Sequence, residues 1–209
     1  MYEIVTIGNG RKESLLYLAS KSPRRAQLLK QIGVDFSVLA VDIPEQIQLH
    51  ETAQSYVQRL AGEKAIAGFC EIKNADATVI AADTLIYINH QVLEKPKNKA
   101  DAIDMLTMLS GNTHSVLTAL SIKNKNKSET IFQSSDVTMR NITQQEMDAY
   151  WDCGEPRDKA GAYAIQGKAA VFISQLQGSY SGVMGLPLYE TANLLKKFDV
   201  DVFADGGRD

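Results

Sequence analysis

Cysteine is scarce in this sequence, and its scarcity excludes two kinds of fold. The chain of 209 residues has only Cys70 and Cys153, which lie far apart and lack the spacing of a zinc site. A small secreted protein stabilised by disulfides needs a denser set of cysteines. We therefore expect both residues to be reduced, partly buried thiols of a cytoplasmic protein.

An excess of positive charge and long apolar runs are missing as well. The 25 acidic residues outnumber the 22 basic ones, which excludes a protein that holds nucleic acid by a strong basic excess. Residues 1–13 lack the apolar run of a signal peptide, and no later stretch is long enough to span a bilayer. These absences indicate a cytoplasmic protein with no nucleic-acid or membrane partner. A small anionic ligand needs only a local basic cluster.

The chain does contain apolar runs that alternate with helical spacing. Runs typical of strands cover residues 15–19, 36–41, 78–82, 85–88, 92–93, 113–122 and 130–139, with two further short strands after residue 161. Helical spacing covers residues 23–32, 53–69, 100–109 and 187–198, and another helix opens at Thr143, where Glu146 completes a capping box. This order predicts an α/β fold, in which a hairpin about residues 124–128 makes the sheet mixed.

No internal repeat, low-complexity tract or linker interrupts this order of elements. We therefore expect residues 15–203 to form a single domain. An extension of residues 1–14, for which the sequence suggests no role, precedes it. Residues 204–209 are small and polar, and we expect them to form a flexible tail.

The loop from Ser20 to Arg25 places two hydroxyls and two guanidiniums at the start of the first predicted helix. Ser22 is suited to cap this helix, Pro23 to begin it and Gly33 to end it. Backbone N–H groups and the helix dipole favour an anion there, and arginine matches phosphate oxygens. The loop alone is equally compatible with a plain cap and solvated arginines.

Acidic Asp83 follows the apolar run 78–82, and we expect the strand to stop there. Ligands of open α/β sheets gather beyond the carboxyl ends of strands, where a carboxylate can hold Mg²⁺ or take a proton from water. The alternative is a turn residue bonded to its own backbone. Glu45 and Asp158 are further loop carboxylates, each of which alone is more typical of a surface residue.

Two lysines and one glutamine complete the candidate residues. Lys64 on the helix 53–69 and Lys95 before Pro96 are compact charges suited to phosphate, although most lysines are simply solvated. The amide of Gln166 offers a donor and an acceptor side by side, which suits the edge of uracil or thymine and equally that of adenine. The three histidines lack the spacing of metal ligands, and we expect His114 to be structural.

Six motifs follow one another in a recognisable order. They are Ser20-x-Ser22-Pro23-Arg24-Arg25, Ala82-Asp83-Thr84, Glu94-Lys95-Pro96, Ser110-Gly111-x-x-His114-x-Val116, Gly154-Glu155-Pro156-x-Asp158-Lys159-Ala160-Gly161-x-Tyr163-x-Ile165-Gln166-Gly167, and Gly178-Ser179-Tyr180 with Gly185-Leu186-Pro187-Leu188. Together they resemble the Maf family of nucleotide pyrophosphatases, from Leu16 to about Phe198. The resemblance implies an elongated mixed β-sheet flanked by helices, like that of inosine-triphosphate pyrophosphatases.

The resemblance also implies an activity and a set of site residues. The family is homodimeric, depends on a divalent cation, here Mg²⁺ or Mn²⁺, and hydrolyses nucleoside triphosphates to the monophosphate and pyrophosphate in a house-cleaning role. By motif match, Asp83 takes the proton-acceptor position and shares the metal position with Glu45. The remaining matches are the base-specificity positions Arg24, Thr84 and Gln166 and the phosphate-binding positions Ser20, Arg25, Lys64 and Lys95.

The Tyr-x-Ile-Gln-Gly form of the Gln166 motif is similar to the branch that cleaves dTTP and UTP. The expected mechanism is attack of water on the α-phosphorus, with phosphates held by the Ser20 to Arg25 loop, Lys64 and Lys95. Two alternatives stay open at this point: a pyrophosphatase of methylated guanine nucleotides from the same family, and a non-catalytic nucleotide-binding regulator of cell division. The stretch from Gly182 to Met184 departs from the family pattern, so we expect the loop adjacent to it to be looser, with the named polar groups unaffected.

Overall fold

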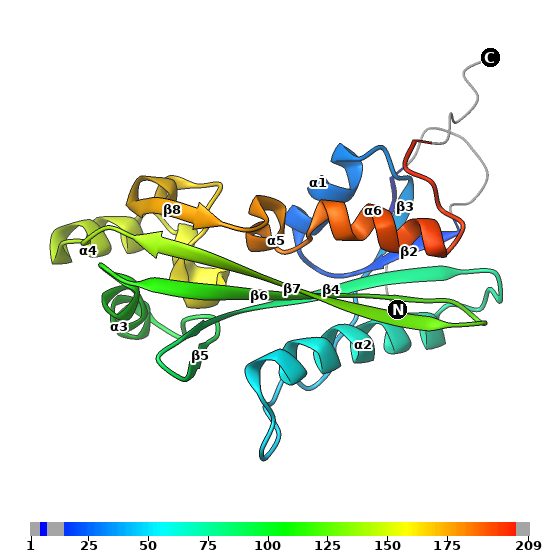
Figure 1. Ribbon diagram of the computed structural model, residues 1–209, viewed down its shortest axis with the longest axis horizontal. Coiled ribbons are helices and arrows are strands. Elements are labelled where there is room, and N and C mark those ends of the chain that lie inside the picture. The colour runs from blue at the N-terminus through cyan, green and yellow to red at the C-terminus, as the bar shows by residue number, and fades with distance from the viewer. Residues whose placement is uncertain (1–4, 8–14, 204–209) are drawn as a thin grey trace. The chain divides into compact units, whose positions relative to one another are not determined.

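The computed structural model describes residues 5–7 and 15–203, which form an α/β structure (Figure 1). Its strands are β1 (Val5–Ile7), β2 (Leu16–Ala19), β3 (Phe36–Leu39), β4 (Thr78–Ile88), β5 (Gln91–Leu93), β6 (Thr113–Lys123), β7 (Ser128–Met139) and β8 (Ile173–Gln177). Its helices are α1 (Pro23–Gln31), α2 (Ala53–Glu71), α3 (Lys99–Leu109), α4 (Gln144–Asp152), α5 (Tyr180–Met184) and α6 (Leu188–Lys197). Three short 3₁₀ helices are η1 (Glu155–Asp158), η2 (Ala160–Ala162) and η3 (Lys168–Phe172).

The sheet is mixed, as the sequence predicted. Its strand order is β1-β3-β2-β4-β6-β7-β8, and β5 pairs with β4. Strand β2 runs parallel to both β3 and β4, whereas β1 with β3, β4 with β5 and β7 with β8 are antiparallel pairs. Helices α1 and α2 provide the crossovers that parallel neighbours require.

The chain divides into two compact units. Unit 1 comprises the described residues up to Asp83 together with residues 119–132 and 185–203, and unit 2 comprises residues 84–118 and 133–184. Strands β4, β6 and β7 each run from one unit into the other. Within the predicted extension of residues 1–14, the structure describes residues 5–7 alone, which pair with β3. The predicted tail of residues 204–209 lies outside the described residues.

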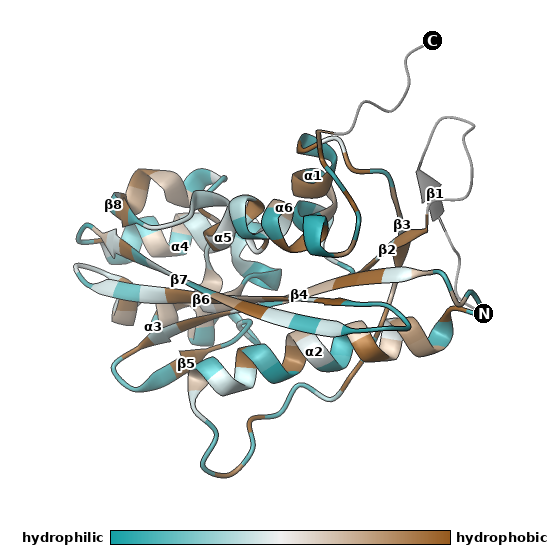
Figure 2. Cartoon of the chain, turned by 45° about the vertical axis from the view of Figure 1, so that its right-hand side comes forward, coloured by the Kyte–Doolittle hydropathy of each residue, from teal (hydrophilic) through white to brown (hydrophobic). Residues whose placement is uncertain are grey.

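Unit 1 is built by close packing of α2 against the sheet. Helix α2 covers one face of β2, β3 and β4, and α1 and α6 lie on the other face (Figure 1, Figure 2). Hydrophobic residues run along β2 and β3 in Figure 2. A methyl group at Gly68 of α2 would lie only 3.0 Å from the Ala19 Cβ and 3.1 Å from a Val79 methyl. This close approach fixes the distance between α2 and the sheet. It therefore also fixes where the polar side chains of α2 lie relative to β4.

Unit 2 has its own apolar core. Residues from β4, β5, α3, β6, β7 and α4 and from the segment 162–172 contribute to it, and its largest aromatic members are Tyr150, Tyr163 and Phe172. The rings of Tyr150 and Phe172 meet edge to face with centroids 5.5 Å apart. The segment that carries Gln166 is therefore anchored in a core on both of its sides.

The expectation that a strand stops at Asp83 is wrong. Strand β4 continues from Thr78 to Ile88 and places Asp83 in its interior. An aspartate ends a strand when its side chain bonds its own backbone. Here the carboxylate instead accepts a hydrogen bond from Lys64, so the backbone remains available for the sheet.

Three smaller expectations are also corrected. Both Cys70 and Cys153 are exposed rather than partly buried. One strand, β8, takes the place of the two expected after residue 161, because residues 168–172 form η3. Ser22 occupies the N-cap position of α1 but makes no side-chain cap bond, and its own N–H donates to the Ser20 Oγ.

In the described part of the chain, no helix combines the length and apolar character needed to cross a bilayer.

Candidate active site

Ser20 and Arg25 organise the loop between β2 and α1 in unit 1. Ser20 is buried directly after β2, and its Oγ accepts the Ser22 N–H at 3.2 Å and the Arg25 Nη1 at 3.3 Å. The Arg25 Nε donates to the Gly185 carbonyl oxygen at 2.8 Å. The guanidinium is thus oriented by two partners from distant parts of the chain, which limits the entropy lost when it binds a ligand.

The Arg25 guanidinium lies in an environment that favours an anion. Burial lowers its pKa from the ordinary value, the carboxylates of Asp83 and Glu45 act in the opposite direction, and the neighbouring charge of Arg24 lowers it further. Two adjacent guanidiniums, one of them desolvated, are stabilised by a negative charge that reaches both. The loop therefore has the electrostatics of a phosphate site.

One lysine joins the two carboxylates that the sequence assigned to a metal. The Lys64 Nζ lies 2.5 Å from a Glu45 oxygen and 2.6 Å from an Asp83 oxygen. The side chains of Lys64 and Asp83 are only 11% and 12% exposed, while that of Glu45 is 46% exposed. Helix α2 supplies Lys64, β4 supplies Asp83 and the loop before α2 supplies Glu45. A charge cluster of alternating sign results beside Arg25.

The donor set of this cluster fits a hard divalent cation. Glu45 and Asp83 offer carboxylate oxygens around a point that already attracts the ammonium of Lys64. No group of three or more His, Cys, Asp or Glu residues suited to a metal occurs in the part of the chain that the structure describes. Mg²⁺ commonly uses one or two carboxylates and takes its other ligands from water and substrate phosphates. Two carboxylates would therefore suffice for such a cation if its other ligands came from water and phosphate.

Thr84, the first residue of unit 2, takes part in a hydroxyl network. Its Oγ1 lies 3.1 Å from that of Thr118, and Thr118 donates to the Gly182 carbonyl oxygen at 2.9 Å. A Cβ at Gly182 would lie 2.4 Å from the Gln133 side-chain oxygen. The stretch from Gly182 to Met184 thus belongs to the closely packed helix α5.

Lys95 and Gln166 are both exposed residues of unit 2. Lys95 follows β5 and precedes the buried Pro96, whose ring fixes the path of the loop. Gln166 lies at the centre of a turn closed by the Gly167 N–H, which donates to the Ala164 carbonyl oxygen at 3.0 Å. The turn leaves Gln166 exposed.

The Glu155 carboxylate stabilises the turn that contains Gln166. One of its oxygens accepts the Tyr150 hydroxyl at 2.6 Å, and the other accepts the Lys168 N–H at 3.0 Å. The Tyr150 oxygen in turn accepts the Ala164 N–H at 3.2 Å. A Cβ at Gly167 would lie 2.3 Å from the Glu155 carboxylate, so the turn approaches that carboxylate as closely as a glycine allows.

His114 is buried in unit 2, as expected for a structural histidine. Its Nε2 lies 2.7 Å from the Tyr163 hydroxyl, and the two rings meet edge to face. Burial lowers the His114 pKa from 6.5 to about 4, against a weak opposing effect of Asp136. Burial also raises the pKa of Tyr163. This pair is therefore neutral at physiological pH and stiffens the segment that leads to Gln166.

A comparison with protein families identifies the chain. The family model described as Maf-like protein matches residues 15–198. This chain belongs to the Maf-like protein family.

Its relatives carry a consistent name. A dTTP/UTP pyrophosphatase of Saccharophagus degradans is 46% identical over 196 residues, which is 93% of each chain. A dTTP/UTP pyrophosphatase of Pseudoalteromonas atlantica is 49% identical over 188 residues, covering 89% of this chain and 98% of the relative. A protein of the same name from Salmonella typhimurium is 46% identical over 184 residues, or 88% of this chain and 93% of the relative.

The structure brings most of the sequence-predicted residues together within unit 1. These are Ser20, Arg24, Arg25, Glu45, Lys64 and Asp83. Unit 2 holds Thr84, Lys95 and Gln166, whose roles stay predictions. Sequence reasoning gave no role to Gly185 and Glu155, although both occur in the quoted motifs. Their roles depend on a backbone carbonyl and on a carboxylate directed at backbone amides, which residue type alone does not reveal.

Proposed function

We propose that this Maf-like protein hydrolyses dTTP and UTP, and modified pyrimidine nucleoside triphosphates, to the monophosphate and pyrophosphate. The names of relatives that are 46–49% identical over most of their length support this activity. The observation that carries it is the Lys64 ammonium bound by both Glu45 and Asp83, beside the desolvated guanidinium of Arg25. Hydrolysis of a phosphoanhydride is mainly a matter of positioning and of charge stabilisation, and this cluster supplies both.

Each residue of the cluster has a distinct part in the proposed reaction. Asp83 orients the attacking water and accepts its proton, since its carboxylate is held by Lys64 and lies where little solvent competes. Arg25 and the backbone of the Ser20 loop bind phosphate oxygens, and Lys64 stabilises the charge that develops on pyrophosphate. Glu45 and Asp83 would hold Mg²⁺ or Mn²⁺, which supplies charge neutralisation on the phosphates when it is bound.

Three residues are proposed to select the base. We propose that the exposed amide of Gln166 pairs with the N3–H and O4 edge of uracil or thymine, and that Arg24 and Thr84 add to base selection. Lys95 is proposed to bind phosphate. A purine that leaves the amide unpaired would cost about 1–3 kcal/mol, or roughly tenfold to a hundredfold in rate.

We also propose a compartment, an oligomeric state and a set of partners for the enzyme. We propose a cytoplasmic homodimer whose only small-molecule partners are the nucleotide and the divalent cation, without nucleic acid or membrane. The family resemblance supports the homodimer. Size-exclusion chromatography with light scattering measures the mass in solution, and a monomer at micromolar concentration would remove that part of the proposal.

The activity is tested with purified protein and a panel of nucleoside triphosphates in Mg²⁺ or Mn²⁺, reading pyrophosphate and monophosphate. We expect turnover of dTTP and UTP that a chelator abolishes. Preferential turnover of methylated guanine nucleotides would assign the protein to that other branch of activity. Tight nucleotide binding with no turnover of any of them would replace the enzyme by a regulator.

A further inference from the structure

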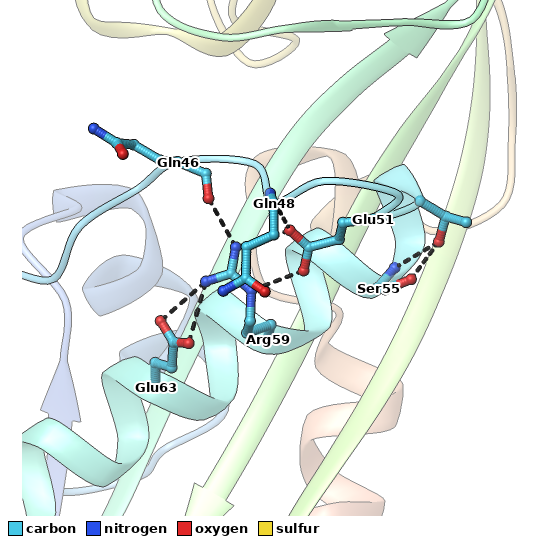
Figure 3. Close-up of polar contacts among 7 residues, drawn as sticks. Gln46, Gln48, Glu51, Ser55, Arg59 and Glu63 are labelled. Atoms are coloured by element: carbon cyan, nitrogen blue, oxygen red, sulfur yellow. Dashed lines mark hydrogen bonds and ion pairs between the residues drawn. The ribbon is translucent and has the colours of Figure 1, made fainter.

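Arg59 of α2 is the centre of a polar network in unit 1 (Figure 3). Its Nε and Nη2 donate to the two oxygens of Glu51 at 2.7 Å and 2.9 Å. Its Nη1 donates to Glu63, one turn further along the helix, at 3.1 Å and 3.2 Å. The guanidinium thus uses its fork on a bidentate carboxylate and retains a donor for one more group.

That remaining donor reaches the backbone beside Glu45. The Arg59 Nη2 donates to the Gln46 carbonyl oxygen at 2.9 Å (Figure 3). Glu51 also binds the segment, because its Oε2 accepts the Gln48 N–H at 2.9 Å. The segment from residue 46 to residue 51 is therefore tied to α2 at both ends through one guanidinium.

The segment has no apolar anchor of its own. Every residue from 44 to 50 is exposed, and Leu49 is 88% exposed. By contrast, the side chains of Arg59 and Glu51 are only 21% and 8% exposed. Since no buried apolar side chain holds the segment down, the position of its backbone depends on Arg59 and on Glu51. The position of Glu45, the residue before Gln46, depends on the same Arg59 contact.

Glu45 also meets α2 directly, through Lys64 at 2.5 Å. Arg59 and Lys64 lie on the same helix, so the loop is held to one rigid element by its main chain and by its functional side chain. Without Arg59, the loop loses its main-chain hydrogen bond to α2. The ion pair with Lys64 is almost half exposed on its carboxylate side, and exposed ion pairs stabilise a loop only weakly.

We propose that Arg59 is a positioning residue, which sets Glu45 opposite Asp83 by binding the Gln46 carbonyl oxygen and Glu51. This inference rests on the proposed function, because it concerns how the cation and the triphosphate find Glu45 in place. Arg59 does not touch the substrate. Its effect passes entirely through the loop, and therefore through Glu45.

Two matched variants separate loop anchoring from loss of an ion pair. Glu51→Gln and Glu63→Gln each remove one carboxylate partner of Arg59, but only Glu51 belongs to the loop. We expect Glu51→Gln and Arg59→Met to lower kcat/KM for dTTP by roughly tenfold to a hundredfold, the range associated with small displacements of a site. Glu63→Gln should stay within about twofold of the wild-type enzyme. Equal losses in Glu51→Gln and Glu63→Gln would contradict the proposal.

The decisive experiment is a double-mutant cycle of Arg59→Met with Glu45→Gln, measured on kcat/KM for dTTP and on the affinity for Mn²⁺ by electron paramagnetic resonance. If Arg59 acts through Glu45, Arg59→Met lowers both quantities in the wild-type background and changes neither further in the Glu45→Gln background. Losses that multiply in both readouts would show a general structural role and overturn the inference. A wild-type protein that releases no pyrophosphate from any nucleotide would instead refute the proposed function, and this inference with it.

Discussion

The Lys64 ammonium lies 2.6 Å from an Asp83 oxygen and 2.5 Å from a Glu45 oxygen. One cation thus separates two carboxylates that would otherwise repel each other. The carboxylates are already directed at a positive charge, which suits the divalent cation that we propose. The order of charges also explains why Lys64 and not a neutral residue occupies this turn of α2.

Replacing Lys64 with Met should separate the binding of the cation from turnover. Without the ammonium, the two carboxylates face Mn²⁺ with no competing charge, so we expect Mn²⁺ to bind at least as tightly as in the wild-type enzyme. We expect kcat for dTTP to fall by at least tenfold, because a charge that stabilises pyrophosphate is lost, on the order of the effect of one electrostatic donor. A Mn²⁺ titration and steady-state kinetics measure the two effects. Weaker Mn²⁺ binding with unchanged kcat would refute this role of Lys64.

Replacing Gln166 with Ala should reduce discrimination between bases. We expect the ratio of kcat/KM for dTTP to that for GTP to fall by roughly tenfold to a hundredfold, since the amide no longer distinguishes the pyrimidine edge. The exposed position of Gln166 predicts an unchanged melting temperature. An equal loss for dTTP and GTP would assign the residue to phosphate or loop positioning.

His114 predicts a dependence of stability on pH. The unfolded chain protonates His114 near pH 6.5, whereas burial holds the folded pKa near 4, so protons favour the unfolded chain between these values. The free energy of unfolding should therefore fall as the pH decreases from about 6.5 towards 4, with a His114 contribution of at most about 1.4 kcal/mol per pH unit. Urea unfolding of the wild type and of His114→Gln across this range measures it. A His114→Gln profile as steep as that of the wild type would contradict this account.

A side chain at Gly161 should destabilise unit 2. Its φ of +64° disfavours any side chain, and a Cβ there would lie 2.5 Å from the Ile86 Cδ1. We expect Gly161→Ala to lower the free energy of unfolding by about 1–3 kcal/mol, from backbone strain and overpacking. Because Ile86 can be shortened, Ile86→Val should relieve part of the loss in the double variant. Urea denaturation of the single and double variants measures this, and no rescue would show that strain at φ alone is responsible.

The sequence predicted the elements well where local signals were strong. Thr143 and Glu146 form the capping box that their spacing indicated, and Gly33 has the positive φ of a helix end. Prediction failed at Asp83, because local chemistry cannot reveal that a lysine nineteen positions earlier in the chain satisfies this carboxylate within a continuous strand. The two cysteines were misjudged for a similar reason, since burial depends on which face of an element is covered.

In the candidate site, too, the sequence indicated which residues matter but not which atoms they contact. Motif order identified Ser20, Arg25 and Asp83 as residues worth testing, but not that Gly185 orients Arg25 through a backbone carbonyl. Arg59 stands outside every quoted motif, and its role emerges only from the path of the loop that it holds. Contacts to backbone atoms carry no signature in a single sequence.

Asp83 is proposed to accept the proton of the attacking water, and a comparison of the wild-type enzyme with Asp83→Asn tests this role. The measurement is pyrophosphate release from dTTP at saturating Mg²⁺ or Mn²⁺, with the melting temperature of both proteins as a check of folding. We expect a folded variant that has lost most of its turnover, by at least about a hundredfold. A folded Asp83→Asn variant with near-normal turnover would contradict it.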